Sequence, residues 1–247
     1  YTFVTTATPA VDEDAYEGSF VHVEYMVQCE GHCTPPSAPP SPPLPSSPPP
    51  PMCAYSATPA GGGNGTNATT TFTDRATVYL GNRRVDLMHL GRAHTAGDIV
   101  IHVPDENVMF TGDIVEYRSA CYCGDGYFAD WGNTLDAIKS YGVDAIAPGR
   151  GDALLGPDMV NTAIENTRDF VQSTYQPAAR VAARNGSLKE AWDAVRGVCD
   201  PKFSDYAIYE HCLPFNVARA YDEARGIAHP RIWTAARDIE MWEQLQG

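Results

Sequence analysis

The pattern of hydrophobic and polar residues changes at Thr71, where β-rich runs separated by turn residues begin. Segments 71–80 (TFTDRATVYL) and 83–90 (RRVDLMHL) are joined by Gly81-Asn82, a strong hairpin signal. A second pair of runs, DIVIHV and NVMFT, flanks the turn-forming residues PDE. The short apolar run VDAIA at 143–147 predicts one more buried strand. The pattern therefore predicts two successive hairpins followed by a further strand.

Apolar residues recur at helical spacing on both sides of that last strand. Segment 129–142 places four large residues on one helical face, namely Trp131, Leu135, Ile138 and Tyr141. After Gly156 the chain becomes helical throughout, and Pro157 lies near the predicted start. Pro177 is expected to interrupt this first long helix, because proline lacks the N–H that a helix interior needs.

Three more helices are predicted toward the carboxyl end. Ser187 followed by Glu190 forms a capping box at the start of SLKEAWDAVRGV. The segments PFNVARAYDEARG and TAARDIEMWEQLQ have the periodicity of two further helices. Their aromatic residues are interpreted as helix-packing residues, with a surface for a protein partner as the less favoured alternative.

The first 70 residues have a different composition. Residues 34–51 (TPPSAPPSPPLPSSPPPP) hold eleven of the chain's 20 prolines, and AGGGNGTNATT follows at 60–70. Such segments favour polyproline II or flexible linkers over packed structure. We therefore expect an acidic head at 1–33, a linker at 34–70, a β-rich α/β core at 71–156 and a helical extension at 157–247.

Charge narrows the set of partners. The formal net charge is −14 and no Lys or Arg precedes Arg75, which disfavours nucleic acid as a partner. No apolar run approaches the roughly 18 residues of a membrane span and no targeting segment is visible, so we expect no membrane partner and favour the cytoplasm. A small-molecule substrate is expected, and a homo-oligomer stays open.

The strongest candidates for chemistry are one histidine and one aspartate that each follow a predicted strand. His94 comes after RRVDLMHL, and Asp113 comes after NVMFT. Imidazole and carboxylate together suit a divalent ion such as zinc. Thr95 and Asp98 lie close enough in sequence to orient His94 through hydrogen bonds.

The complete string HLGRAHTAGDIVIHVPDENVMFTGDIV resembles the middle of metallo-β-lactamase-fold hydrolases, and the weaker match VDAIAPGRGD extends the resemblance over residues 71–152. The resemblance implies an αββα sandwich, of which this chain represents mainly the second half. It also implies that His94 is the third metal-site histidine, that Asp113 is the bridging aspartate and that Asp98 is structural. The family binds one or two zinc ions.

Two departures from the family pattern affect the expected activity. None of the seven histidines begins the leading H-x-H-x-D-H motif, and Arg150 occupies the last ligand position in APGRG. A guanidinium has no lone pair for a metal. A truncated or misjoined segment upstream of residue 71 would explain the missing motif. Arg150 itself suits an anionic ligand, or else a salt bridge to Asp113 or Asp152.

We therefore expect a metal-dependent hydrolase that cleaves an ester, thioester, lactone or amide through metal-activated water. Zinc binding by this chain should be weak or absent, and we therefore expect the chain itself to hydrolyse such substrates poorly or not at all. The alternative is a degenerate fold without catalysis that binds an anion through Arg150 or a protein through its terminal helices. Ligands from the CEGHC segment (Cys29, His32 and Cys33) would complete the site only if unrecognised zinc ligands exist there.

Overall fold

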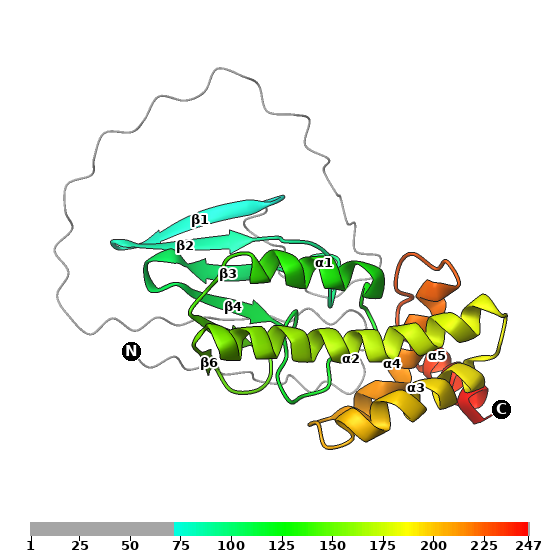
Figure 1. The fold of residues 1–247 in the computed structure, drawn as a ribbon. Coiled ribbons are helices and arrows are strands. Elements are labelled where there is room, and N and C mark those ends of the chain that lie inside the picture. The colour runs from blue at the N-terminus through cyan, green and yellow to red at the C-terminus, as the bar shows by residue number, and fades with distance from the viewer. Residues whose placement is uncertain (1–71, 247) are drawn as a thin grey trace. The chain divides into compact units, whose positions relative to one another are not determined.

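A computed structural model describes residues 72–246. Six strands form one mixed sheet in the order β1-β2-β3-β4-β5-β6 (Figure 1). All neighbouring strands are antiparallel except β4 and β5, which are parallel. The strands are β1 (Arg75–Leu80), β2 (Arg83–Met88), β3 (Val100–Val103), β4 (Val108–Gly112), β5 (Ala145–Pro148) and β6 (Leu154–Leu155).

Both predicted hairpins are present. Gly81 has φ +66° in the turn between β1 and β2, a conformation that glycine adopts without the clash of a Cβ atom. The turn between β3 and β4 is a single 3-10 turn, η1 (Pro104–Glu106), and Asn107 closes it with φ 50°. The predicted strand at 143–147 corresponds to β5, and the short β6 was not predicted.

Two helices lie on one face of the sheet, α1 (Phe128–Lys139) and α2 (Pro157–Ala183) (Figure 1). The predicted apolar face of α1 is confirmed, because Trp131, Leu135 and Ile138 are fully buried. From the sheet, Met88, Val100, Met109 and Ile146 join the same apolar core. Burying these strand residues together with the helical stripe fixes the helices on this face.

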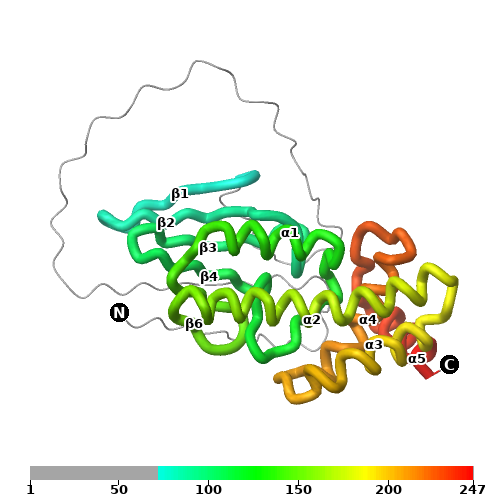
Figure 2. The backbone as a smooth tube through the Cα atoms, viewed as in Figure 1, coloured from blue at the N-terminus to red at the C-terminus, as the bar shows by residue number. Residues whose placement is uncertain are grey.

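The remaining helices are α3 (Leu188–Phe203), α4 (Tyr209–Ala224) and α5 (Ala235–Gln246). Helices α3 and α4 pack against α2 and against each other, and α5 packs against α3. The backbone path in Figure 2 shows the three helices gathered at one end of α2. The predicted capping box is confirmed, because Ser187 Oγ accepts from the Glu190 N–H and the Glu190 carboxylate accepts from the Ser187 N–H.

The expected interruption at Pro177 is wrong. Helix α2 runs through Pro177 without a break, and Pro201 and Pro214 likewise lie inside α3 and α4. Pro177 is buried, and α2 packs against α1, α3 and α4. The packing of the apolar face outweighs the roughly 3 kcal/mol that an interior proline costs. For the same reason α4 begins at Tyr209, five residues before the predicted start at Pro214.

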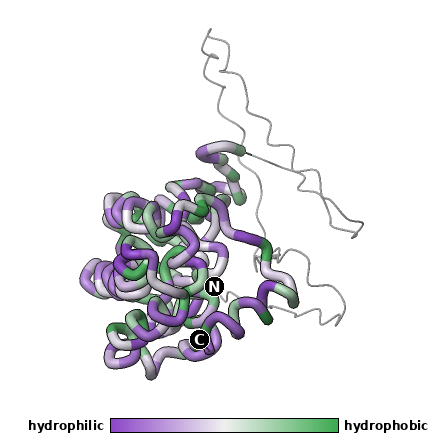
Figure 3. Tube along the Cα trace, turned by 90° about the vertical axis from the view of Figure 1, so that its right-hand side faces the viewer, coloured by the Kyte–Doolittle hydropathy of each residue, from purple (hydrophilic) through white to green (hydrophobic). Residues whose placement is uncertain are grey.

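The architecture confirms the expected α/β fold with a helical carboxyl-terminal extension. Residues 72–246 contribute one sheet with helices on one face. Hydrophobic and hydrophilic positions alternate along the tube in Figure 3, as expected for elements that each bury one side. No helix in this part of the chain combines the length and apolar character that crossing a bilayer requires.

Candidate functional site

Strand directions bring the two predicted metal-site residues to one edge of the sheet. Strands β2 and β4 are both antiparallel to β3, so their carboxyl ends lie at the same edge. His94 lies in the loop after β2, and Asp113 directly follows β4. The His94 Nε2 atom is 3.8 Å from the Asp113 Oδ2 atom. The two side chains therefore occupy the same end of the sheet.

The His94 ring is held by two aromatic side chains. Trp131 of α1 meets the imidazole edge-on, with ring centroids 6.2 Å apart. The Tyr122 ring is tilted relative to the imidazole, and these two centroids are 6.3 Å apart. The His94 Nε2 atom is buried and has no hydrogen-bond partner among the described residues. A buried imidazole nitrogen normally has a hydrogen-bond partner. The carboxylate of Asp113 is nearby, but it is too far from this nitrogen to form a hydrogen bond with it.

Asp98 forms its hydrogen bonds with the loop that carries His94, and not with the imidazole ring. Its carboxylate accepts from the Thr95 N–H at 2.8 Å and from the Thr95 hydroxyl at 2.6 Å. Burial raises the pKa of the Asp98 carboxyl, and the hydrogen bonds from Thr95 counteract this effect. Thr95 and Asp98 therefore position His94 through the backbone, which refines the expected role of these two residues.

A glycine loop packs directly over Asp113. Gly149 donates its N–H to the carbonyl oxygens of Gly112 (2.8 Å) and Val115 (3.1 Å). A Cβ atom at Gly149 would lie 2.6 Å from the Gly112 carbonyl carbon and closer still to the Asp113 carboxylate. Only glycine permits this approach, so the loop after β5 fixes the position of Asp113.

The shortest salt bridge of Arg150 joins it to Glu116, a partner that the sequence did not indicate. Its guanidinium donates to Glu116 Oε1 at 2.5 Å, and Asp113 Oδ2 lies 3.8 Å from the same nitrogen. The predicted pairing with Asp113 is therefore present, but Glu116 is the shorter contact. No ion pair joins Arg150 to Asp152 within residues 72–246. Burial raises the pKa of Glu116 to about 8, and Arg150 counteracts that rise.

Four residues around His94 and Asp113 were not predicted to belong to the site, namely Glu116, Tyr122, Asp125 and Trp131. Cys123 and Gly124, in the loop that precedes α1, are buried. Burial raises the pKa of Asp125, and His94 is the largest of the groups that oppose the rise. Trp131 also donates its indole N–H to the Ile114 carbonyl at 2.9 Å, next to Asp113. Helical periodicity had identified Trp131 as a core residue but gave no sign of these contacts.

Two atoms at this end of the sheet are of the types that bind zinc in proteins. An imidazole nitrogen without a partner and a carboxylate oxygen 3.8 Å from it are the atom types that zinc prefers. No group of three or more His, Cys, Asp or Glu side chains that could hold a metal occurs between residues 72 and 246. Cys29, His32 and Cys33 lie outside the described residues.

The four described cysteines are unsuited to metal binding or redox chemistry as they stand. Burial raises the pKa of each thiol, and the thiolate is the form that binds metals and attacks electrophiles. All four are free and buried, namely Cys121, Cys123, Cys199 and Cys212. They therefore act as small apolar core residues.

Comparison with known proteins confirms the resemblance. Residues 48–150 match the model of the Metallo-beta-lactamase superfamily. The match begins upstream of the predicted boundary at residue 71 and includes His94, Asp113 and Arg150. Residues 48–150 are therefore similar to the metallo-β-lactamase superfamily, and the α/β fold described above agrees with this similarity.

Two curated relatives are both metallo-beta-lactamases of type 2. The chain is 31% identical to the Bacteroides fragilis protein over 111 residues, 43% of this chain and 44% of the relative. It is 29% identical to the Bacillus cereus protein over 80 residues, 30% of this chain and 31% of the relative. A solved metallo-beta-lactamase from Pontibacter korlensis is 19% identical with a TM-score of 0.36, covering 41% of this chain and 47% of that one. The chain thus spans less than half the length of these relatives.

Proposed function

We propose that this chain contains part of a metal-dependent hydrolase, in which His94 and Asp113 are two ligands of a zinc ion. The observation that carries the proposal is the buried, unpartnered Nε2 atom of His94 facing the Asp113 carboxylate 3.8 Å away. A polar atom left without a partner in a folded protein suggests a ligand. Zinc bound there would supply Lewis acidity, which polarises a carbonyl and activates water for hydrolysis of an ester, thioester, lactone or amide.

The surrounding residues would hold the two ligands in place. Trp131 and Tyr122 fix the plane of the imidazole, and Gly149 fixes the backbone beside Asp113. Catalytic zinc sites use at least three protein ligands, and the described residues offer two. The further ligands would have to lie outside residues 72–246, and the chain as it stands should bind zinc weakly.

The second candidate function is a fold without catalysis. It is favoured by Arg150, which stands where the family has its last ligand and which adds positive charge 3.8 Å from Asp113. A cation there opposes a second metal ion. Arg150 could instead recruit an anion, although Asp113 and Glu116 already lie against its guanidinium.

Calorimetric titration with zinc separates the two candidates. The native chain should bind one ion far more weakly than the roughly 10–16 kcal/mol of complete structural zinc sites. His94→Ala and Asp113→Asn should each abolish the binding. His211→Ala is the matched control, because it removes an exposed imidazole from α4.

The result that would overturn the proposal is zinc binding that survives His94→Ala, since the ligands would then lie elsewhere. Tight binding by the native chain that His94→Ala abolishes would instead mean that Cys29, His32, Cys33 or other residues complete the site. No binding at all would favour the non-catalytic fold. Hydrolysis of model esters and β-lactams with and without zinc provides the activity readout.

A further inference from the structure

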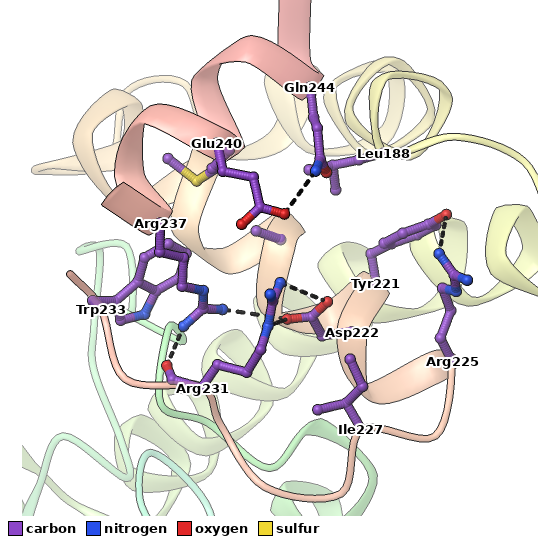
Figure 4. A pocket seen from close by; sticks show the side chains of 12 residues that line it. Leu188, Tyr221, Asp222, Arg225, Ile227, Arg231, Trp233, Arg237, Glu240 and Gln244 are labelled. Carbon is purple, nitrogen blue, oxygen red and sulfur yellow. Dashed lines mark hydrogen bonds and ion pairs between the residues drawn. The ribbon is translucent and has the colours of Figure 1, made fainter. Parts of the chain in front are cut away.

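A cleft of about 330 Å³ opens between α4, α5, the loop that joins them and the start of α3 (Figure 4). It belongs to the helical extension, outside the residues that match the metallo-β-lactamase superfamily. Leu188, Ile227 and Met241 provide apolar walls, and three arginines are among the polar residues of the lining, namely Arg225, Arg231 and Arg237. Small-ligand sites combine apolar walls with a few converging polar groups in this way.

Two of the arginines share a single carboxylate. The Asp222 Oδ2 atom accepts from Arg231 Nε at 2.9 Å and lies 3.3 Å from a terminal nitrogen of Arg237. Asp222 and Arg237 are buried, whereas Arg231 is exposed. One carboxylate balances one guanidinium, so this trio keeps a net positive charge. Burial lowers the pKa of Arg237, and the neighbouring positive charge of Arg231 lowers it further.

The third arginine has no acidic partner in the described part of the chain. Arg225 donates only to the hydroxyl of Tyr221, at 3.3 Å, and is exposed at the mouth of the cleft. Glu240 is the other acidic residue of the lining, and it accepts from Gln244 on its own helix (Figure 4). Three guanidinium groups and two carboxylates give the cleft a net charge of about +1, in a chain with a formal net charge of −14.

The cleft is held in shape before any ligand arrives. The fully buried Arg219 donates to the Ile227 carbonyl at 2.9 Å and so ties the connecting loop to α4. The Arg237 guanidinium lies 3.5 Å from the centre of the Trp233 ring. A cation stacked on an indole and paired with Asp222 has little freedom to move. Such preorganisation lowers the entropic cost of binding.

We propose that this cleft binds a small organic anion, with its carboxylate or phosphate among Arg225, Arg231 and Arg237 and its apolar body against Leu188 and Met241. Guanidinium groups recognise both kinds of anion through charge-assisted hydrogen bonds. The volume of about 330 Å³ suits a ligand of modest size. This site is separate from His94 and Asp113 and does not depend on the proposed zinc chemistry.

Benzoate, phenyl phosphate and inorganic phosphate are suitable probes, used on the full chain in buffer with a metal chelator. Binding is measured by calorimetry and by the fluorescence of the tryptophans, because Trp233 lines the cleft. The affinities for benzoate and phenyl phosphate, compared with each other, show which anionic group the site prefers. Benzyl alcohol is the uncharged comparison, and inorganic phosphate tests whether the apolar walls contribute.

Two variants at exposed positions change the charge of the cleft in opposite directions. Arg225→Gln should weaken binding of the preferred probe about 5- to 10-fold, while Glu240→Gln should strengthen it about 3-fold. Their controls are Arg180→Gln on α2 and Glu243→Gln on α5, which make the same charge changes at exposed residues outside the lining. Melting temperatures confirm that all four variants fold.

The proposal requires saturable binding of benzoate or phenyl phosphate. The two cleft variants must change the affinity in opposite directions, and the two control variants must leave it unchanged. It is overturned if neither probe saturates below about 10 mM, or if Arg225→Gln and Glu240→Gln change binding no more than their controls. Equal affinity for inorganic phosphate and phenyl phosphate would refute the apolar half of the proposal. Binding of benzyl alcohol as tightly as benzoate would refute the anionic half.

Discussion

The indole of Trp131 stands perpendicular to the imidazole of His94, at an interplanar angle of 89° and a centroid distance of 6.2 Å. The same indole donates its N–H to the Ile114 carbonyl, one residue after Asp113. One fully buried side chain of α1 thus contacts both loops of the candidate site. The distance between His94 and Asp113 therefore depends on how α1 packs against the sheet.

Trp131→Phe should weaken zinc binding more than it changes the overall fold. Phenylalanine keeps most of the apolar packing, but the Ile114 carbonyl loses its donor inside the protein, at a cost of about 1–3 kcal/mol of unfolding free energy. Urea denaturation measures that loss, and zinc titration measures the effect on the site. Equal zinc affinity in the variant would show that Trp131 does not position His94 and Asp113.

Gly149→Ala should disturb the site through a steric clash. The added methyl group would overlap the backbone of Gly112 and the carboxylate of Asp113, so the loop after β5 must move, at a cost of roughly 1–3 kcal/mol. Gly197→Ala is the matched control, because an added methyl there meets nothing within 4 Å on an exposed helix position. That variant should gain about 0.5–1 kcal/mol from helix propensity. Comparable denaturation midpoints for the two variants would contradict the close approach of Gly149 to Gly112 and Asp113.

Sequence reasoning succeeded where the signals were local. Gly81-Asn82 and the PDE turn specify hairpins through their own backbone preferences, and two consecutive hairpins make β2 and β4 run in the same direction. The ends of those strands then meet at one edge, which is why the proximity of His94 and Asp113 was predictable from spacing. The family resemblance added roles to these residues that spacing alone did not provide.

The failures involve contacts between residues distant in sequence. Glu116 lies 34 positions from Arg150, and the loops that bring them together are joined by backbone hydrogen bonds such as Tyr117 N–H to the Arg150 carbonyl. No local pattern encodes such a pair. The predicted break at Pro177 was wrong for a related reason. The packing of α2 against its neighbours outweighs the local preference of proline against helix interiors.

Arg150→Ala should destabilise the protein by removing the partner of a buried carboxyl. The Glu116 side chain is fully buried, whereas 38% of the Arg150 side chain is exposed, so we expect about 1–2 kcal/mol, below the range for fully buried pairs. In the Glu116→Gln background the same substitution should cost less, because no carboxylate is left unpaired. A double-mutant cycle by urea denaturation at pH 9 measures this coupling. Additive losses would show that the salt bridge contributes nothing.

The stability of the native chain should fall as the pH rises toward 8. Burial raises the pKa of Glu116 to about 8 in the folded protein, from 4.5. A carboxyl with a raised folded-state pKa holds its proton more tightly than in the unfolded chain. Its contribution is complete below about pH 4.5 and is lost as the pH rises through about 8. Unfolding free energies between pH 5 and 9 should show this decline in the native chain, and a flatter profile in Glu116→Gln. Parallel profiles would mean that another group titrates.

Asp98→Ala should loosen the loop that carries His94, whereas Asp98→Asn should largely preserve it. Alanine leaves the Thr95 N–H and hydroxyl without their acceptors, which costs about 1–3 kcal/mol. Asparagine can still accept from the Thr95 N–H and can donate to the hydroxyl oxygen. Zinc affinity should therefore decrease in the order native, Asn and Ala, with Asp105→Ala as an exposed control in η1. If Asn and Ala weaken zinc binding equally, the negative charge of Asp98 matters more than its hydrogen bonds.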